Sequence, residues 1–207
     1  MGYEKKIIIV GAGGHAQSCI DVIESTGIYT IYGLVGSPQE NNLNRHGYKI
    51  IGNDEDLAAI VKVVPNALIS VGQIKNSIRR ESLYRLAIAV GFNLPIVQSK
   101  HAYVSDKSII GKGTILMHGV IVNANATIAE NCIINSRALI EHGVQISKNT
   151  HVSTGVIING DARIGKGTFI GSGSIIKEGV VIGENCIIPM GAKVKHNVPD
   201  NSTYQGK

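Results

Sequence analysis

A repeat of six residues organises the second half of the chain. Between Val104 and Val194 every sixth residue is a branched aliphatic, and four residues after each comes a residue no larger than valine. A period of six fits neither an α-helix nor a simple alternating strand, so it predicts a coil that turns a corner once per hexad. The sixteen aliphatic positions are Val104, Ile110, Leu116, Val122, Ile128, Ile134, Ile140, Ile146, Val152, Ile158, Ile164, Ile170, Ile176, Ile182, Ile188 and Val194.

A second, longer period shows how the hexads are grouped. Short tripeptides rich in glycine and asparagine recur every eighteen residues, beginning with Gly111, Lys112 and Gly113. Glycine and asparagine tolerate a left-handed backbone, so one edge of the coil is expected to carry the same tight turn each time. Three hexads then make one triangular coil, with the large aliphatic side chains filling its axis. Roughly five coils at about 4.8 Å each predict a prism of about 24 Å.

The N-terminal half instead alternates apolar runs with amphipathic segments. This alternation predicts a small open parallel sheet of the nucleotide-binding, Rossmann-like kind. We expect an α/β domain over residues 1–99 and a prism domain over residues 100–207. The elements expected in the first domain are strands at 6–10, 30–35 and 67–71, a helix ending near residue 25, a short helix at 55–61 and a longer helix at 77–90.

Composition narrows the class of protein. The chain is 43% hydrophobic and 17% charged, which is typical of a globular protein long enough for two modest domains. The longest apolar run near the start, Ile7 to Val10, is too short for a signal peptide or a membrane span. We therefore expect a cytoplasmic protein. Cys19, Cys132 and Cys186 are scattered and are expected to be reduced packing residues, with no metal site.

The net charge of +5 raises the question of nucleic acid. The basic residues are spread mostly singly, and Arg79 and Arg80 form the only arginine pair. No stripe of the sequence alternates basic with aromatic residues, which argues against nucleic-acid binding. An anionic small ligand is the more economical partner.

The first strand is followed by a glycine-rich loop that spans Gly11 to His15. Glycines let a backbone approach a ligand closely, and free N–H groups at a helix start attract phosphate. Gly13, Gly14 and His15 are therefore predicted to bind the substrate, together with Gly72 at the same edge of the sheet. The third position of the dinucleotide fingerprint is Ala16, so a tight turn without ligand remains the alternative. His15 either donates to a phosphate or caps the turn.

The two halves together carry a resemblance to a known family. The hexads resemble those of the left-handed parallel β-helix acyltransferases. Nearly the whole chain resembles bacterial sugar acetyltransferases of the NeuD and PglD type. These acetylate sialic acid on oxygen, or UDP-linked 4-amino-sugars on nitrogen, in surface polysaccharide biosynthesis. The resemblance implies a nucleotide or sugar in the N-terminal domain, acetyl-CoA along the prism, and a homotrimer with active sites between neighbouring prisms.

The segment from Asn135 to Gly143 carries the catalytic part of the resemblance. By resemblance His142 is the general base, which takes a proton from the attacking amine or hydroxyl. It lies two residues after the inward Ile140, so we expect it near a corner, from which it could reach a neighbouring prism. The aminosugar N-acetyltransferases place an acidic residue directly after the base, but here that residue is Gly143, which resembles the sialic acid branch more closely. Glu141 is therefore expected to raise the basicity of His142, and Asn135 is expected to contact the acceptor.

The cofactor residues also follow from the resemblance. It implies that His151 lies beside the thioester of acetyl-CoA and that the Gly160 N–H faces its carbonyl oxygen. Ser172 and Met190 match positions that line the rest of the cofactor. One departure concerns the acceptor: Val35 and Gly36 stand where the aminosugar branch has an acidic pair against the nucleotide.

The sequence is compatible with two functions. The first is direct acetyl transfer from acetyl-CoA to a nucleotide-linked or sialic-acid-type sugar, on nitrogen or oxygen, in a ternary complex. No Ser-His-Asp order or metal-ligand spacing stands out, which disfavours a covalent acyl-enzyme. The alternative is a non-catalytic regulator that binds a sugar nucleotide. A base that faces a thioester favours the enzyme, because a pure binding module does not need one.

Overall fold

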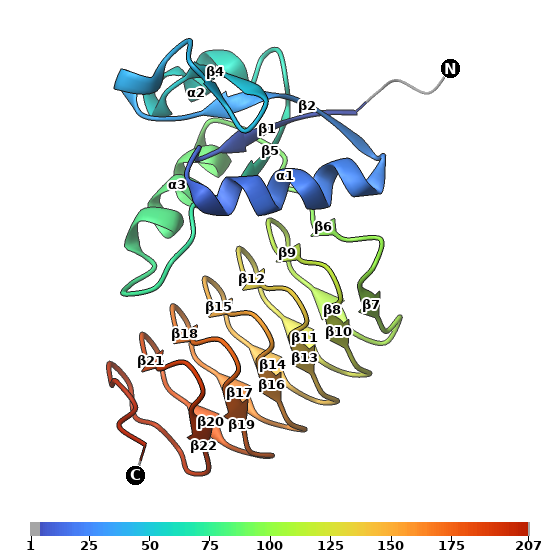
Figure 1. The fold of residues 1–207 in the computed structure, drawn as a ribbon, viewed down its shortest axis with the longest axis vertical. Helices are drawn as coiled ribbons and strands as arrows, with labels where there is room; N and C mark the ends of the chain where they lie inside the picture. The colour runs from blue at the N-terminus through green and yellow to red at the C-terminus, as the bar shows by residue number, and fades with distance from the viewer. Residues whose placement is uncertain (1–4, 207) are drawn as a thin grey trace.

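The computed structural model describes residues 5–206, which form an α/β domain seated on one end and one side of a long prism (Figure 1). The domain contains a five-stranded sheet of order β3-β4-β2-β1-β5. Strand β1 (Lys5–Val10) lies at its centre, parallel to β2 (Tyr29–Val35) and to β5 (Asn66–Ile69). These three strands match the three that the sequence predicts, which confirms the parallel sheet.

A hairpin at one edge of this sheet was not predicted. Strand β3 (Asn44–Arg45) pairs antiparallel with β4 (Tyr48–Gly52), and β4 extends the parallel sheet beside β2. The hairpin escapes a pattern search because both residues of β3 are exposed, and β4 buries only Ile50 and Gly52. A short 3₁₀ helix, η1 (Pro38–Glu40), precedes the hairpin.

Three α-helices cover the two faces of the sheet. Helix α1 (Gly14–Thr26) packs Cys19 and Ile23 into a core that continues into the prism. Helices α2 (Leu57–Ile60) and α3 (Ile78–Ala89) belong to the core on the opposite face. Helix α2 is shorter than predicted because the acidic segment before it forms a 3₁₀ helix, η2 (Asp54–Asp56), capped by Asn53.

The prism is built from three parallel sheets, which we name after their first strands: the β6, β7 and β8 faces. Each strand pairs with the strand eighteen residues further on, as Ile121 does with Tyr103 and Leu139. This register confirms three hexads per coil and a parallel β-helix. The strands are β6 (Val97–Gln98), β7 (Tyr103–Val104), β8 (Ile109–Ile110), β9 (Ile115–Leu116), β10 (Ile121–Val122), β11 (Thr127–Ile128), β12 (Ile133–Ile134), β13 (Leu139–Ile140), β14 (Gln145–Ile146), β15 (His151–Val152), β16 (Ile157–Ile158), β17 (Arg163–Ile164), β18 (Phe169–Ile170), β19 (Ile175–Ile176), β20 (Val181–Ile182), β21 (Ile187–Ile188) and β22 (Lys193–Val194).

The aliphatic hexad residues fill the axis of the prism as expected. Fourteen of the sixteen are buried, and Val104 and Ile110 at the first coil are half-buried. Left-handed turn residues occur at all three edges, and not only at the one that the sequence analysis singled out. Arg137, Gly143 and Asn149 represent the three edges, with φ of +59°, +69° and +59°. A triangular coil needs a sharp turn at every corner, and arginine or aspartate fills some of them.

The α/β domain covers the β6 face of the prism. Strand β6, just before the expected boundary at residue 99, already pairs with β9. The guanidinium of Arg80 is buried and donates to the carbonyl oxygens of Asn131 in the prism and of Ile69 in the sheet. Gln73 Nε2 donates to the carbonyl oxygen of Asn149 over 2.7 Å. These contacts fix the first domain against the prism.

Two further expectations concern the cysteines and the membrane. Cys19, Cys132 and Cys186 are buried free thiols, in line with their predicted role in packing. Burial raises the pKa of Cys19 to about 12 and that of Cys132 to about 11, so both stay protonated. Within residues 5–206 no helix combines the length and apolar character that crossing a membrane requires.

Candidate functional site

His142 lies at the edge between the β7 and β8 faces, directly after β13, and its side chain is exposed. Gly160 holds the same place one coil further on. A Cβ atom built on Gly160 would lie 2.6 Å from Cε1 and 2.8 Å from Nε2 of His142. The imidazole ring therefore rests on the Gly160 backbone, and the structure brings together these two predicted residues.

The backbone of Gly160 is partly engaged in the coil. Its carbonyl oxygen accepts the N–H of Gly179 at 2.9 Å, and the next residue, Asp161, donates its N–H to the carbonyl oxygen of His142 at 3.0 Å. Among the hydrogen bonds of residues 5–206, the Gly160 N–H has no acceptor. This edge thus combines an exposed imidazole with a free backbone donor directly below it.

Glu141 does not pair with His142. Its carboxylate is half-buried and accepts a hydrogen bond of 2.9 Å from Asn123 Nδ2, one coil earlier. No hydrogen bond joins Glu141 to the His142 ring in the described part of the chain. The expectation that Glu141 raises the basicity of His142 therefore stays a prediction without a contact to support it.

The remaining predicted cofactor residues lie elsewhere on the prism. Ser172 and Met190 follow β18 and β21 and lie on the edge between the β6 and β7 faces. Ser172 shares a hydrogen bond of 2.8 Å with Ser153, and Met190 is 82% exposed. Within one chain these residues are on a different edge from His142 and Gly160.

His151 is on the β6 face and points into the boundary between the two domains. It is buried, with Nδ1 2.7 Å from the carbonyl oxygen of Gln73, and its ring lies edge-on to Phe169. Burial, partly offset by the Gln73 hydrogen bond, lowers the pKa of His151 to about 4. The neutral ring then donates from Nδ1, so Nε2 is the acceptor that faces Asn135 Nδ2 at 3.5 Å.

His15 is brought close to this group from the glycine-rich loop. Its ring centroid lies 6.2 Å from that of His151, and Gly72 packs against its Cβ. Its Nε2 atom is buried and makes no hydrogen bond to any described residue. Burial, with the nearby Arg80 charge, lowers the pKa of His15 to about 3. No side chain caps helix α1, so the capping alternative for His15 is wrong.

The glycines of the loop have different roles. Gly11 has φ of +112°, and a Cβ there would lie 2.8 Å from Val71 Cγ2, so the fold itself requires this glycine. Gly13 caps helix α1 and Gly14 opens it, and both are exposed. A Cβ on either would meet no protein atom within 4 Å. Packing of the chain therefore gives no reason for glycine at positions 13 and 14.

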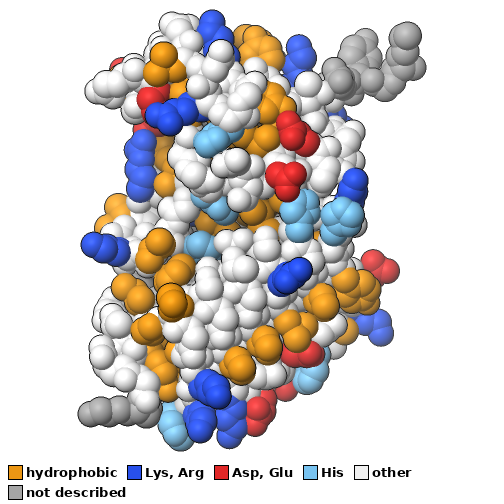
Figure 2. Space-filling model, viewed as in Figure 1, with side chains coloured by type: hydrophobic (Ala, Val, Ile, Leu, Met, Phe, Trp, Pro, Cys, Tyr) orange, Lys and Arg blue, Asp and Glu red, His pale blue; other side chains and the backbone are white. Residues whose placement is uncertain are grey.

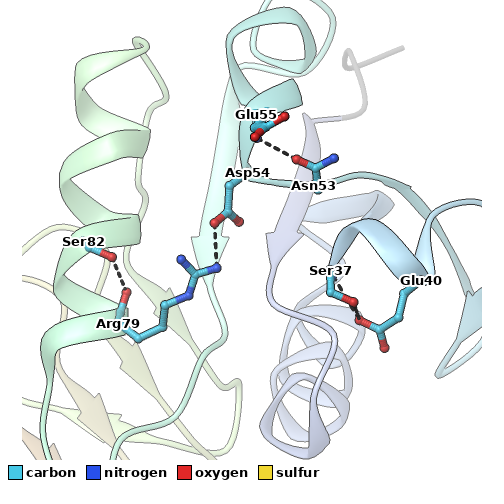
Figure 3. Close-up of polar contacts among 7 residues, drawn as sticks. All are labelled: Ser37, Glu40, Asn53, Asp54, Glu55, Arg79 and Ser82. Carbon is cyan, nitrogen blue, oxygen red and sulfur yellow. Dashed lines mark hydrogen bonds and ion pairs between the residues drawn. The ribbon is translucent and has the colours of Figure 1, made fainter.

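A pocket of about 140 Å³ opens beside this loop at the carboxyl edge of the sheet. Figure 3 shows that Glu40 accepts hydrogen bonds from Ser37 Oγ at 2.8 Å and Ser37 N at 3.0 Å. The same figure shows Arg79 Nη2 paired with Asp54 Oδ2 at 2.6 Å. The pocket is lined by Gly11, Ala12, Val35, Gly36, Ser37, Glu40, Asp54, Val71, Arg79 and Leu83.

The sequence analysis missed Glu40 and Asp54. Hydrogen bonds from the Ser37 backbone and side chain lower the pKa of the half-buried Glu40 carboxyl, which keeps it ionised. A signal for Glu40 was present, because serine followed three residues later by glutamate is a capping-box pattern. These carboxylates face the pocket beside Val35 and Gly36, where the sequence had suggested that acidic groups were missing.

One arrangement in the structure resembles a catalytic triad without being able to act as one. His118 Nδ1 lies 2.6 Å from Ser99 Oγ, and His118 Nε2 lies 2.8 Å from Asp21 Oδ2. Ser99 has no exposed surface, so no substrate can reach its hydroxyl. The three residues instead join helix α1 to the first coils of the prism.

Comparison with known proteins gives the class. Three family models match: the PglD N-terminal domain over residues 6–92, the hexapeptide repeat of succinyl-transferase over 125–159, and the bacterial transferase hexapeptide (six repeats) over 161–196. No curated protein sequence matches the chain. The fold and these repeats define a hexapeptide-repeat acyltransferase.

Several solved structures are similar over nearly the whole chain. PerB from Caulobacter crescentus, in complex with CoA and GDP-perosamine, is 28% identical, with 96% of this chain and 92% of that chain covered and a TM-score of 0.88. A histidine-to-asparagine mutant of the perosamine N-acetyltransferase from the same organism is 26% identical, with the same coverage and a TM-score of 0.90.

The third comparison is with a protein from another organism. The acetyltransferase domain of PglB from Neisseria gonorrhoeae, in complex with acetyl coenzyme A, is 26% identical, with 97% of this chain and 96% of that chain covered and a TM-score of 0.87. The chain thus combines a PglD N-terminal domain with hexapeptide repeats, and it is similar in fold to sugar N-acetyltransferases.

Proposed function

We propose that the protein transfers an acetyl group from acetyl-CoA to an amino or hydroxyl group of a nucleotide-linked sugar. The observation that carries this proposal is the exposed His142 imidazole resting on Gly160, whose N–H is free. Two of the similar structures contain CoA with GDP-perosamine, and a third contains acetyl coenzyme A. An acceptor of this kind would serve the assembly of bacterial surface glycans.

The chemistry follows from these two groups. The acceptor nitrogen or oxygen attacks the thioester carbon while His142 removes its proton, a contribution of about 10²–10⁴-fold. The carbonyl oxygen becomes an oxyanion, and the Gly160 N–H donates to it, a contribution of about 10²–10³-fold. The carbon–sulfur bond then breaks, and the thiol of CoA leaves with the proton.

A groove on the β7 face suits the phosphates of CoA. It has a volume of about 470 Å³ and begins at Asn159, beside Gly160. Lysine side chains supply positive charge that attracts a phosphorylated cofactor. The groove is lined by Asn159, Ile175, Lys177, Glu178, Lys193, Val194, Lys195 and His196.

The outward side chains of the β7 face suit an interface between subunits. Figure 2 shows a band of hydrophobic side chains that runs along the prism. The α/β domain covers the β6 face, and the β8 face presents Thr127, Gln145 and Arg163 at the matching positions. Within residues 5–206 only the β7 face has a continuous column of hydrophobic residues facing outward, namely Tyr103, Ile121, Leu139, Ile157 and Ile175.

We infer that β7 faces pack around a threefold axis to form a homotrimer. The β7 face is bounded by the His142 edge on one side and by the edge with Ser172 and Met190 on the other. Threefold packing brings the first edge of one subunit beside the second edge of its neighbour. Ser172 and Met190, which are separated from His142 and Gly160 within one chain, then line one shared site with them.

The acceptor fits the α/β domain. Gly13 and Gly14 leave open backbone at a helix start, which suits a phosphate, and His15 offers an unpartnered Nε2 nearby. Glu40 and Asp54 in the adjacent pocket provide carboxylates that can accept hydrogen bonds from a ribose or a base. We propose that this pocket holds the nucleotide.

A substitution in the glycine-rich loop tests whether the α/β domain binds the acceptor while the prism binds acetyl-CoA. Gly13→Val has room within the protein, so the fold should persist while the side chain blocks the acceptor's phosphate. The acceptor KM should rise tenfold for roughly each 1.4 kcal/mol lost, and acetyl-CoA affinity measured by calorimetry should not change. Gly11→Val is the matched control, because it clashes with Val71 and should lower the melting temperature. An unchanged acceptor KM in Gly13→Val would show that the loop is only a turn.

Gly160→Ala tests the contact between the base and the backbone. The added methyl group would lie within 3 Å of the His142 ring, so the ring must move. We expect kcat to fall at least about tenfold, since a general base acts only within hydrogen-bond reach of its proton. Thermal melting should change little, because the ring is exposed and free to move away. A kcat equal to that of the parent would show that the position of the ring over Gly160 does not matter.

The proposed activity is tested by thiol release from acetyl-CoA with a panel of nucleotide-linked amino sugars and sialic acid. We expect release that depends on one class of acceptor and saturates with it. The same panel decides between nitrogen and oxygen as the acetylated atom. Binding of an acceptor without thiol release above the acceptor-free rate would contradict the proposal.

A further inference from the structure

We propose that Asp161 orients His142 from the neighbouring coil and acts as its positioning residue. This inference rests on the proposed role of His142 as the general base. The Asp161 carboxylate lies nineteen positions after His142 in the sequence, one residue more than a full coil. Stacking of the coils brings the two residues onto the same edge of the prism.

The backbone at this edge shows why the carboxylate lies there. Gly143 and Asp161 hold the same turn position in consecutive coils, with φ of +69° and +60°. A Cβ atom on Gly143 would collide with Asp161 Oδ1. The Asp161 side chain therefore reaches back across the gap between the coils and occupies the space where a side chain of residue 143 would be.

The His142 ring crosses the same gap in the opposite direction. It rests on Gly160, which immediately precedes Asp161, while the Asp161 carboxylate rests on Gly143, which immediately follows His142. The Asp161 N–H also donates to the His142 carbonyl oxygen at 3.0 Å, which holds the two backbones together. The His142 ring and the Asp161 carboxylate thus occupy neighbouring positions on one edge, each against a glycine of the other coil, while no hydrogen bond or ion pair joins them among residues 5–206.

The Asp161 carboxylate is also available. It makes no hydrogen bond or ion pair with any side chain among residues 5–206, that of His142 included, so the proposed contact needs the two side chains to turn towards each other. The nearest alternative in sequence, Glu141, is held by Asn123. Asp161 is therefore the carboxylate that this edge offers to His142.

A carboxylate beside an imidazole acts in two ways. In the proposed contact it accepts the N–H of one ring nitrogen, which leaves the other nitrogen unprotonated and ready to take a proton. It also stabilises the imidazolium that forms when the acceptor is deprotonated. Gly143 then has a second reason to be glycine: besides the left-handed turn, it leaves room for this carboxylate.

The first test is Asp161→Asn, which keeps the shape and removes the charge. We expect kcat to fall at least about tenfold, as part of the contribution of a general base, with both KM values within about twofold of the parent. The ¹⁵N shifts of the His142 ring should change from one dominant tautomer to a mixture. A parent-like kcat and tautomer in this variant would overturn the proposal, because a space-filling role is satisfied by asparagine.

The second test exchanges the two turn residues. The double variant G143D/D161G moves the carboxylate by one coil and removes the collision at residue 143. Both positions already have positive φ, which aspartate tolerates. We expect the exchange to recover kcat to within about threefold of the parent, while D161G alone stays as low as Asp161→Asn. An exchange variant that melts like the parent but remains as slow as D161G would overturn the proposal.

The variant His142→Ala distinguishes failure of the proposed Asp161 role from failure of the proposed His142 role. If that variant is inactive while Asp161→Asn is fully active, only the role of Asp161 is wrong. If His142→Ala retains the parent activity, the base lies elsewhere and the proposed function of this edge fails first.

Discussion

Replacing His142 with alanine should lower kcat by about 10²–10⁴-fold, the full contribution of a general base. The side chain is exposed and only rests on Gly160, so its removal leaves no cavity and no unpaired buried group. The melting temperature and the acetyl-CoA affinity should therefore stay at their parent values. Initial rates of thiol release at saturating acceptor measure the effect.

A second histidine serves as the control for this variant. His101 is exposed on the first coil, where its ring lies 5.7 Å from that of His118 and far along the prism from Gly160. His101→Ala should keep kcat within about threefold of the parent. Activity of His142→Ala within the same range would mean that another group removes the proton.

The substitution Ile121→Glu should separate the trimer into monomers and remove activity with it. Ile121 is 41% exposed in the single chain, so the folded subunit tolerates a carboxylate there. In the proposed assembly three such charges would be buried close to the axis without partners, at a cost of several kcal/mol. Light scattering measures the mass, and thiol release on the same samples measures activity.

The prism provides a matched control on another face. Ile109 is 66% exposed on the β8 face, which has no continuous hydrophobic column. Ile109→Glu should leave both the trimer and the activity unchanged. A parent protein that runs as a monomer at micromolar concentration, or full activity in monomeric Ile121→Glu, would remove the shared site.

The prism could be predicted because its contacts repeat along the chain. Each inward residue, such as Ile140 or Ile158, has the same environment as the residue eighteen positions away, so sixteen weak signals add up. The hairpin of β3 and β4 repeats nothing and buries little, so no pattern marked it. Glu40 and Asp54 come together at one pocket only in the folded chain, and the capping-box pattern of Ser37 and Glu40 marks a helix start and not a ligand site.

The contacts of the candidate site could also be predicted only in part from the sequence. The pairing of His142 with Gly160 was accessible from the sequence, because eighteen residues separate them and the coil repeats every eighteen. Glu141 was chosen as the partner of His142 because it is adjacent in sequence, but adjacent residues in a coil point in different directions. The carboxylate that we propose as its partner, Asp161, comes from the following coil and lies against Gly143, which only the structure makes visible.

We propose a shared site because the predicted cofactor residues Ser172 and Met190 lie on a different edge from His142 within one chain. The alternative to acetyl transfer is a protein that binds a sugar nucleotide and performs no chemistry. The two are distinguished by what happens to the bound sugar and not by affinity, since both predict binding.

The most direct measurement is mass spectrometry of a nucleotide-linked amino sugar after incubation with acetyl-CoA and the protein. We predict that the sugar gains one acetyl group for each CoA thiol released, and that His142→Ala yields no more product than a reaction without protein. A sugar nucleotide that binds tightly but is recovered unchanged, with no thiol released, would contradict acetyl transfer and leave a binding protein in its place.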